Sequence, residues 1–210
     1  MTARRRTSGT LVAIEGIDGA GKSTLRREVA RELRGRGWKV GLWREPSRPS
    51  VGRRALALAS SDPVGAAIHF TLDRLLARPR LERLLRDREV VLSDRSFYST
   101  LAYQGSGLPT RGRQALQRLQ QRVARSPDLV LWVDLPVEEA LRRVGRRGSV
   151  RSPVERRRML RRVSAAYRAM ARGRRWIRLD GREPARRLAV SATQALLPRL
   201  RRRVPPRRRG

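Results

Sequence analysis

Short apolar runs alternate with longer amphipathic segments along most of this chain. The apolar runs are rich in Val, Leu, Ile or Trp and end at turn-forming or charged residues, a pattern typical of buried β-strands. The pattern predicts strands over residues 10–15, 39–44, 89–93, 129–134 and 175–180. The segments between them carry apolar residues at helical spacing and predict helices over residues 22–36, 63–86, 96–103, 111–125, 137–144, 153–172 and 184–197.

The alternation of strands and helices predicts an α/β fold, with a parallel sheet covered by helices on both faces. The sequence shows no internal repeat and no linker, so residues 10–200 are expected to form a single domain. Pro79 is expected to break the helix predicted over residues 63–86. Residues 1–9 and 201–210 are like-charged segments punctuated by glycine or proline, and we expect both to be disordered tails.

The charge of the chain is strongly unbalanced, with 51 Lys and Arg against 18 Asp and Glu and a formal net charge of +33. Such an excess is typical of proteins that bind polyanions. It also arises from a proteome-wide compositional bias in which arginine is used in place of lysine. Arginine is spread over every predicted helix and aromatic residues make up only 4% of the chain, which favours the bias. We therefore expect non-specific adhesion to nucleic acid and other polyanions, and no specific nucleic-acid partner.

Composition also excludes several classes of site. The sequence has no cysteine, which excludes disulfides, thiol nucleophiles and cysteine-ligated metals. No apolar run is long enough to span a membrane, and the basic N-terminal segment lacks the apolar core of a secretory signal. We therefore expect a cytoplasmic protein without a membrane partner.

The segment IEGIDGAGKST, residues 14–24, follows the first predicted strand and opens the first predicted helix. It fits the pattern Gly-x-x-x-x-Gly-Lys-Ser/Thr, in which glycine backbone and a helix N-terminus direct N–H groups at phosphate. Lys22, one of only two lysines in the chain, is placed to reach the β- and γ-phosphates. ATP is the expected ligand, and the expected binding residues are Gly16, Ile17, Asp18, Gly19, Ala20, Gly21, Lys22, Ser23 and Thr24.

A second group of candidate residues follows the strand predicted over residues 89–93. Asp94, at the carboxyl end of that strand, is suited to hold Mg²⁺ through its water shell, together with the Ser23 hydroxyl. Arg95 beside it is suited to bind phosphate oxygens through two N–H groups. A surface ion pair is the alternative for an Asp-Arg pair, but the phosphate loop in the same chain favours a metal and phosphate site.

These motifs, with four further segments, resemble the thymidylate kinases, a branch of the P-loop nucleoside monophosphate kinases. The matching segments are AIEGIDGAGKST, WREPS, HFTLDR, VVLSDRSFYSTLAYQG, PDLVLWVDLPVEEALRR and RRVSAAYRAMA. The resemblance implies a P-loop NTPase fold whose five parallel strands follow the order 2-3-1-4-5, with an arginine-rich lid near residues 145–155. It also implies transfer of the γ-phosphoryl group of ATP to dTMP, giving dTDP, with Mg²⁺ as cofactor, and a homodimer.

The resemblance further implies roles for individual residues in binding dTMP. Asp18 would accept a hydrogen bond from the sugar 3′-hydroxyl, although turn propensity explains an aspartate there equally well. Phe70 would stack on the base, and Arg74, one helical turn later on the same face, would donate to its O4. Packing in the core is the alternative for Phe70. The remaining implied contacts, to the monophosphate, sugar and base, are Arg44, Arg95, Thr100, Tyr103 and Gln104.

Members of this family differ in the source of a catalytic arginine, which lies either in the phosphate loop or in the lid. The loop position is Gly19 in this chain, so the lid is expected to supply the arginine and to neutralise charge on the transferred phosphoryl group. Arg147 is the preferred candidate among Arg143, Arg146, Arg147 and Arg151. The predicted catalytic residues are then Lys22, Arg95, Arg143 and Arg147.

The sequence departs from the family pattern at three places. Ser96 stands where an aromatic residue or histidine usually follows Asp-Arg, and the Arg-Glu-Pro segment lacks the usual Gly-Gly-Thr continuation. The lid reads VRSPVE where an Asp-Arg-aromatic/Ile-Glu run is usual. These departures bear on the acceptor and on the lid chemistry, and leave nucleotide binding untouched.

Two other functions fit parts of the sequence. A deoxynucleoside kinase has a similar phosphate loop, a Glu-Pro segment and an acidic-Arg-Ser motif, and in such an enzyme Glu45 would remove the proton of a sugar 5′-hydroxyl. The Phe70–Arg74 pair and the STLAYQG segment favour the monophosphate kinase. A nucleic-acid-binding ATPase is the third interpretation, and it rests only on the positive charge.

Overall fold

The computed structural model describes residues 9–144 and 153–203, and the strands of this part form a five-stranded sheet. Its strand pairings are all parallel, and the strand order is β2-β3-β1-β4-β5. The predicted fold, a P-loop α/β sheet in the order 2-3-1-4-5, is therefore confirmed. The strands are β1 (Thr10–Glu15), β2 (Val40–Arg44), β3 (Val90–Asp94), β4 (Leu129–Asp134) and β5 (Trp176–Asp180).

The predicted helices are all present, with small shifts at their ends. The largest shift is in α8, which continues to Arg203 instead of ending at residue 197. The prediction of a disordered tail from residue 201 is therefore wrong for residues 201–203, where Arg203 also pairs with Asp128. None of the described helices is long and apolar enough to cross a membrane. The helices are α1 (Lys22–Gly35), α2 (Pro49–Leu58), α3 (Pro63–Asp87), α4 (Phe97–Tyr103), α5 (Thr110–Val123), α6 (Val137–Val144), α7 (Pro153–Met170) and α8 (Ala185–Arg203), with a 3-10 helix η1 (Gly105–Gly107).

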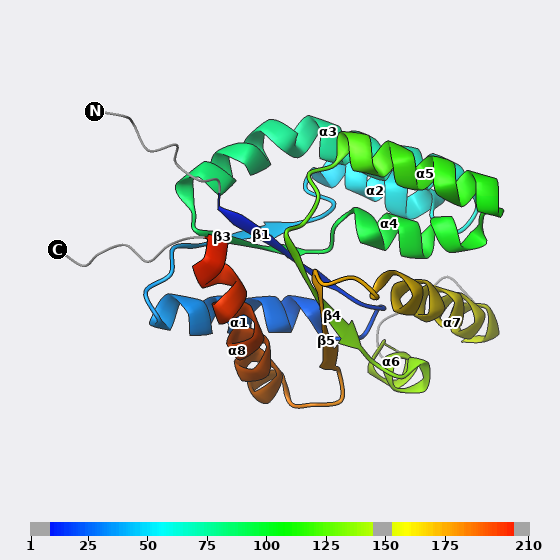
Figure 1. Ribbon diagram of the computed structural model, residues 1–210. Coiled ribbons are helices and arrows are strands. Elements are labelled where there is room, and N and C mark those ends of the chain that lie inside the picture. The colour runs from blue at the N-terminus through cyan, green and yellow to red at the C-terminus, as the bar shows by residue number, and fades with distance from the viewer. Residues whose placement is uncertain (1–8, 145–152, 204–210) are drawn as a thin grey trace.

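Helices cover both faces of the sheet, with α1 and α8 on one side and α3, α4 and α5 on the other (Figure 1). Successive residues of a strand point to opposite faces, so each buried strand packs in two directions. Val12 and Leu92 belong to the apolar cluster that includes α1 and α8, whereas Leu11 and Val91 pack with α3. Glu15 lies four residues after Leu11 and so faces the same side as α3 and α4.

Helix α3 is continuous and contains Pro79, so the predicted break at this proline is wrong. Pro79 and Leu75 are both exposed, and the Leu75 carbonyl that lacks its helical N–H partner can bond to water. On the opposite side of the helix Ala77 and Leu81 are buried against the sheet. Packing of this buried face holds the helix together across the proline.

Helix α2 is absent from the prediction because its short sequence, PSVGRRALAL, contains a proline and a glycine, and its large apolar residues do not form the buried face: Leu56 is 62% exposed. Its buried residues are Gly52 and Ala55. A Cβ at Gly52 would lie 2.5 Å from Pro46 Cγ, so the helix approaches the preceding loop more closely than any other residue would allow. Close packing along α3, visible in Figure 1, stabilises this helix.

The carboxyl ends of β2, β3 and β1 meet at one edge of the sheet. Asp94 of β3 is in register with Arg44 of β2 on one side and with Ile14 of β1 on the other. The phosphate loop that follows β1 therefore lies beside the residues that follow β3. This edge is where open α/β sheets bind their ligands.

Candidate active site

A cleft of about 540 Å³ opens at the carboxyl edge of the sheet. Its walls come from the phosphate loop, α1, the ends of β2 and β3, α6 and α7. Arg27 of α1 and Arg156 of α7 also line it, and the sequence did not single them out. The cleft brings together the predicted residues Asp18, Gly19, Gly21, Lys22, Ser23, Thr24, Arg44, Asp94, Arg95 and Arg143.

Glycines give the phosphate loop a conformation that other residues adopt only with strain. Gly19 and Gly21 have φ angles of 88° and 84°, in the left-handed region. A Cβ at Gly19 would lie 2.7 Å from the Ala140 carbonyl oxygen, so the loop has no room for a catalytic arginine at this position. Gly21, by contrast, borders open space in the cleft. Ile17 and Ala20 are buried in the core and anchor the loop from behind.

The N-terminus of α1 points its free backbone groups at the cleft. Gly21 occupies the N-cap position and offers no side-chain acceptor to the first N–H groups of the helix. These N–H groups, together with the positive end of the helix dipole, form a site suited to an anion. The loop that leads to them begins at Gly16, where a Cβ would lie 2.6 Å from the Val133 carbonyl oxygen.

Lys22 lies in the first turn of α1 and is nearly buried, with 7% exposure. Its Nζ donates a hydrogen bond to the Ile17 carbonyl oxygen at 2.8 Å, so the ammonium group is held against the loop. Burial, and next the nearby Arg95 guanidinium, lower the pKa of Lys22 from 10.5 to about 8. At neutral pH the group is therefore mainly protonated, and phosphate oxygens beside it would favour the charged form further.

Ser23 and Asp94 provide oxygen atoms suited to a metal ion. The Ser23 hydroxyl donates a hydrogen bond to Asp94 Oδ2, and both residues line the cleft. A hydroxyl and a carboxylate fit Mg²⁺, which usually takes few protein ligands and completes its octahedron with water and phosphate oxygens. In the described ranges, no cluster of three or more His, Cys, Asp or Glu residues could hold a metal. The residues therefore fit Mg²⁺ that arrives with a nucleotide.

Arg95 follows β3 in a strained backbone conformation. Its φ angle is 76°, in the left-handed region that residues other than glycine seldom adopt. The guanidinium Nη2 forms an ion pair with Asp18 of the phosphate loop, and the guanidinium carbon lies 5.3 Å from the centroid of the Tyr103 ring. Burial opposes the ionisation of Asp18, but Arg95 and then Lys22 outweigh it and hold the pKa of Asp18 below its usual value.

Four of the predicted acceptor residues are not among those that line the cleft. The Tyr103 hydroxyl accepts a hydrogen bond from the Asp18 N–H at 2.9 Å and so ties α4 to the phosphate loop. Thr100 and Gln104, on the same helix end, are buried. Phe70 is half-buried and belongs to neither apolar cluster of the described residues, which argues against core packing as its main role.

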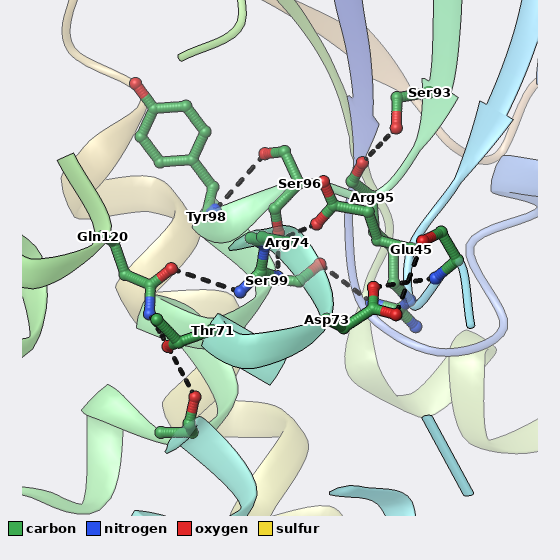
Figure 2. Close-up of polar contacts among 12 residues, drawn as sticks. Glu45, Thr71, Asp73, Arg74, Ser93, Arg95, Ser96, Tyr98, Ser99 and Gln120 are labelled. Atoms are coloured by element: carbon green, nitrogen blue, oxygen red, sulfur yellow. Dashed lines mark hydrogen bonds and ion pairs between the residues drawn. The ribbon is translucent and has the colours of Figure 1, made fainter. Parts of the chain in front are cut away.

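Arg74 does not line the cleft either, and it is 93% buried in a network of polar side chains (Figure 2). Its Nε donates to Glu45 Oε2 at 2.6 Å, its Nη1 to Gln120 at 3.2 Å and its Nη2 to the Ser96 carbonyl oxygen at 3.2 Å. Burial raises the pKa of Glu45, although Arg74 opposes the rise. Sequence reasoning missed this network because its members come from four distant segments of the chain.

The predicted catalytic arginines of the lid are only partly described. Arg147, with Arg146 and Arg151, lies outside the described residues. Arg143 ends α6, where it donates to Glu139 at 2.6 Å and to the Gly181 carbonyl oxygen at 3.1 Å. Arg156, in the first turns of α7, is half-buried and lines the cleft together with the phosphate loop.

The sequence matches a family model over most of its length. Residues 14–191 match the model described as thymidylate kinase. The chain belongs to the thymidylate kinase family. The matched range contains the phosphate loop, all the predicted site residues and the segment of the lid, so the resemblance drawn from short motifs is confirmed.

Individual thymidylate kinases are similar to this chain over most of both lengths. One from Prochlorococcus marinus is 36% identical, over 82% of this chain and 87% of its own. A probable thymidylate kinase from Archaeoglobus fulgidus is 32% identical, over 75% of this chain and 80% of its own. Another from Thermococcus gammatolerans is 40% identical, over 66% of this chain and 72% of its own.

Membership of the thymidylate kinase family argues against the deoxynucleoside kinase. The contacts of Glu45, the residue that would be its general base, argue against it as well. A general base needs a carboxylate that is free to accept a proton from the substrate. Here the Glu45 carboxylate is paired with buried Arg74, with only 13% of the glutamate side chain exposed. Glu45 borders the cleft, but its carboxylate is paired with Arg74 and holds that side chain in place, so it is not free to act as a base.

Proposed function

We propose that this chain catalyses the ATP-dependent phosphorylation of dTMP to dTDP. The observation that carries the proposal is a single cleft in which a phosphate loop and Lys22 share one space with Arg44 and Arg95. Two phosphorylated molecules need such an arrangement, because the charge that both bring must be neutralised before they can react. The thymidylate kinase family supports dTMP as the acceptor and ATP as the donor.

The donor side binds ATP through the phosphate loop. Backbone N–H groups of the loop and the N-terminus of α1 donate to the phosphate oxygens. Lys22 adds a positive charge. Its ammonium group exchanges the hydrogen bond to the Ile17 carbonyl for one to a phosphate oxygen, because a charged phosphate oxygen is the stronger acceptor. Mg²⁺, held with Ser23 and Asp94, supplies further neutralisation of the β- and γ-phosphates.

The acceptor side holds dTMP through side chains. Arg95 and Arg44 bind its monophosphate, and Asp18 accepts a hydrogen bond from the sugar 3′-hydroxyl. Phe70 stacks on the base. Arg74 has five N–H groups, three of which donate to Glu45, Gln120 and the Ser96 carbonyl, and the other two are left for the base. Thr100, Tyr103 and Gln104 provide the remaining contacts to the sugar and the base.

In the reaction an oxygen of the dTMP phosphate forms a bond to the γ-phosphorus of ATP. The bond between this phosphorus and the β–γ bridging oxygen breaks, and ADP leaves. Since the second pKa of a phosphate ester is about 6, the attacking oxygen carries no proton at neutral pH and needs no general base. Catalysis is then a matter of alignment and charge neutralisation, which the cleft provides.

Two residues are candidates for the catalytic arginine, Arg147 in the lid segment and Arg156 in α7. Arg147 stays a prediction, because it lies outside the described residues. Arg156 is the candidate that the cleft itself supports, since it is the α7 residue that lines it. Arg143 contacts Glu139 and Gly181 and is better placed to shape the wall of the donor side.

The proposal is tested by identifying the product made from radiolabelled ATP. The purified chain is offered thymidine, dTMP or the other nucleoside monophosphates in separate reactions. We expect labelled dTDP from dTMP and no labelled product from thymidine. Labelled dTMP from thymidine would establish the deoxynucleoside kinase instead. ATP hydrolysis stimulated by DNA, with no labelled nucleotide acceptor, would establish the nucleic-acid-binding ATPase.

A homodimer is part of the same proposal, and the surface of α3 supports it. Val64, Ile68 and Leu72, spaced four residues apart, are 52%, 57% and 41% exposed, and Leu75 and Leu76 continue the stripe. An apolar stripe of this kind on a chain rich in charge is typical of a surface that packs against a second copy. We expect a dimer in solution, and Ile68→Arg should shift its mass to that of a monomer in light scattering.

The remaining sequence predictions stay proposals. We propose a single domain over residues 10–200, a cytoplasmic location, and only non-specific adhesion to polyanions. Binding to nucleic acid should then weaken steeply with salt and show no preference for sequence. The terminal segments 1–9 and 201–210 should be dispensable for the kinase reaction.

A further inference from the structure

Glu15, the last residue of β1, is a fully buried carboxylate with no role in the reaction proposed above. Its Oε1 accepts hydrogen bonds from the N–H and the hydroxyl of Ser96, both at 2.7 Å. Its Oε2 accepts from the hydroxyl of Ser99 at 2.7 Å and from that of Tyr167 at 2.8 Å. None of the ion pairs among the described residues includes Glu15. Burial of a carboxylate costs free energy, and four hydrogen bonds offset this cost here. Such a site suggests that the carboxylate positions the groups that bind it.

The groups that Glu15 binds enclose Arg95 from two directions. Ser96 directly follows Arg95, so the bond from its N–H to Glu15 fixes the backbone just after the strained residue. Ser99 accepts a hydrogen bond from Arg95 Nη1 at 3.1 Å, which fixes one edge of the guanidinium. Figure 2 shows Ser96 and Ser99 close to Arg95. The other guanidinium nitrogen, Nη2, is left to face Asp18.

The direction of these hydrogen bonds follows from the groups that make them. The Glu15 carboxylate accepts at both oxygens, and each hydroxyl has a single proton to donate. Ser99 and Tyr167 therefore both donate their protons to Oε2. The Ser99 oxygen then has only lone pairs to offer to Arg95, which is what the guanidinium N–H needs.

The same network gives a role to Ser96, the residue that directly follows Arg95. Its hydroxyl donates to Glu15 at 2.7 Å and accepts from the Tyr98 N–H at 3.3 Å, so it also caps α4. Ser96 thus joins the start of α4, which carries Ser99, to the carboxylate.

We propose that Glu15 is a positioning residue for the acceptor phosphate, acting on Arg95 through Ser96 and Ser99. It holds the strained turn after β3 and orients the Ser99 hydroxyl, so that the guanidinium is presented to the monophosphate of dTMP in one orientation. This inference rests on the proposed function, because it takes the dTMP phosphate as the group that Arg95 binds. It goes beyond that function in assigning the reaction a residue that touches neither substrate.

The test is the variant Glu15→Gln, which keeps the size of the side chain but places an N–H₂ group in the network. If this group faces Ser99 and Tyr167, the Ser99 hydroxyl accepts from it and can no longer be reserved for Arg95. We expect the KM for dTMP to rise about tenfold, which is the size of effect expected when a hydrogen bond to a charged group is lost. The KM for ATP should change less than about twofold. Steady-state kinetics with each substrate varied in turn measures both values.

Two further variants separate positioning from a loss of stability. Ser99→Ala removes the acceptor for Arg95 directly and should raise the KM for dTMP about fivefold. Tyr167→Phe removes the second hydroxyl donor to Oε2, which also lies 3.0 Å from Ser99 Oγ, but it takes away no group that is hydrogen-bonded to Arg95. Because Ser99 can still donate to Oε2 and accept from Arg95, Tyr167→Phe should raise the KM for dTMP less than Ser99→Ala does. The double variant Glu15→Gln/Ser99→Ala should cost less than the two single effects combined, because both act on one contact.

Every result bears on the proposal. An unchanged KM for dTMP in folded Glu15→Gln, an equal rise in both KM values, or full additivity in the double variant would overturn it. If Glu15→Gln does not fold, Ser99→Ala decides in the same way. A wild-type chain that does not phosphorylate dTMP would overturn the proposed function and this inference with it. Failure of the variants alone would leave the function standing.

Discussion

The donor wall and the acceptor wall of the cleft are built in different ways. The donor wall is one continuous segment, residues 14–24, which offers a phosphate backbone N–H groups, glycine geometry and a helix N-terminus. The acceptor wall is assembled from side chains of β2, α3, β3 and α4, held by the ion pairs Arg74–Glu45 and Arg95–Asp18. The donor wall therefore depends on local chain geometry, whereas the acceptor wall depends on tertiary packing.

This difference separates the two tasks of the enzyme. A backbone site recognises phosphate groups without regard to the rest of the nucleotide, because N–H groups are alike along any chain. Side chains differ in size, charge and direction, so they can select the acceptor nucleotide. Substitutions in the donor wall should therefore lower turnover, and substitutions in the acceptor wall should act first on the KM for dTMP.

The largest effect is expected from Lys22→Ala. The substitution removes the one side-chain cation of the donor wall that lies inside the loop, and we expect kcat to fall about a thousandfold with the fold intact. Lys39→Ala is the matched control, because Lys39 is the other lysine of the chain and is exposed. Near-normal turnover in Lys22→Ala, measured by a coupled assay of ADP release, would contradict the donor wall as described.

Arg156→Ala tests whether α7 contributes a catalytic cation. Arg156 lines the cleft, and an arginine on the transferred phosphoryl group lowers the barrier electrostatically, so we expect kcat to fall about a hundredfold. Arg157→Ala is the matched control, since Arg157 is paired with Glu138 and does not line the cleft. If both variants turn over like the wild type, the catalytic arginine lies elsewhere, and Arg147→Ala is then expected to show the loss.

Phe70→Ala sharpens the comparison on the acceptor side. Loss of a stacked aromatic ring should raise the KM for dTMP about tenfold and leave kcat and the KM for ATP nearly unchanged. Arg83→Ala, at an exposed position of the same helix outside the apolar stripe of Val64, Ile68 and Leu72, controls for a general effect on α3. An unchanged KM for dTMP in Phe70→Ala would remove base stacking from the account.

The smallest effect is expected from pH and concerns Lys22. With a pKa of about 8 in the folded chain, Lys22 loses its charge as the pH rises through 8, so kcat/KM for ATP should fall above that pH. The fall in kcat should begin at a higher pH, because bound phosphates stabilise the ammonium form. A flat profile of kcat/KM for ATP between pH 7 and about 10 would contradict a depressed pKa.

The same depressed pKa has a consequence for stability. Between the folded pKa of about 8 and the ordinary value of 10.5, the unfolded chain binds more protons at Lys22 than the folded chain does. The contribution of Lys22 to the free energy of unfolding therefore increases with pH in this window, and its cost is fully present below pH 8. Denaturation of the wild type and of Lys22→Ala at several pH values isolates this contribution.

The sequence predicted the donor wall far better than the acceptor wall, for the same physical reason. The phosphate loop is specified by contiguous residues, so the pattern around Lys22 was sufficient to place it at the end of β1 and the start of α1. The pairing of Arg74 with Glu45, Gln120 and the Ser96 carbonyl depends on segments far apart in the chain, and no local pattern reports it.

Two errors in the fold have a related cause. The continuity of α3 through Pro79 depends on the packing of Ala77 and Leu81. The existence of α2 depends on the close contact of Gly52 with Pro46. Local propensity alone favours a break at the proline and a loop around the glycine. The role of Arg156 could have been suspected from helical spacing after the lid, but so could several neighbouring arginines.

The central claim is that one cleft holds two phosphorylated nucleotides, one on backbone and one on side chains. A crystal structure of the chain with ADP, Mg²⁺ and dTMP tests it most directly. The account predicts the ADP phosphates within hydrogen-bonding distance of the N–H groups of residues 16–23, and the dTMP phosphate on Arg95 with its base over Phe70. A structure with dTMP bound away from Arg95, or with the phosphate loop making no contact with ADP, would contradict it.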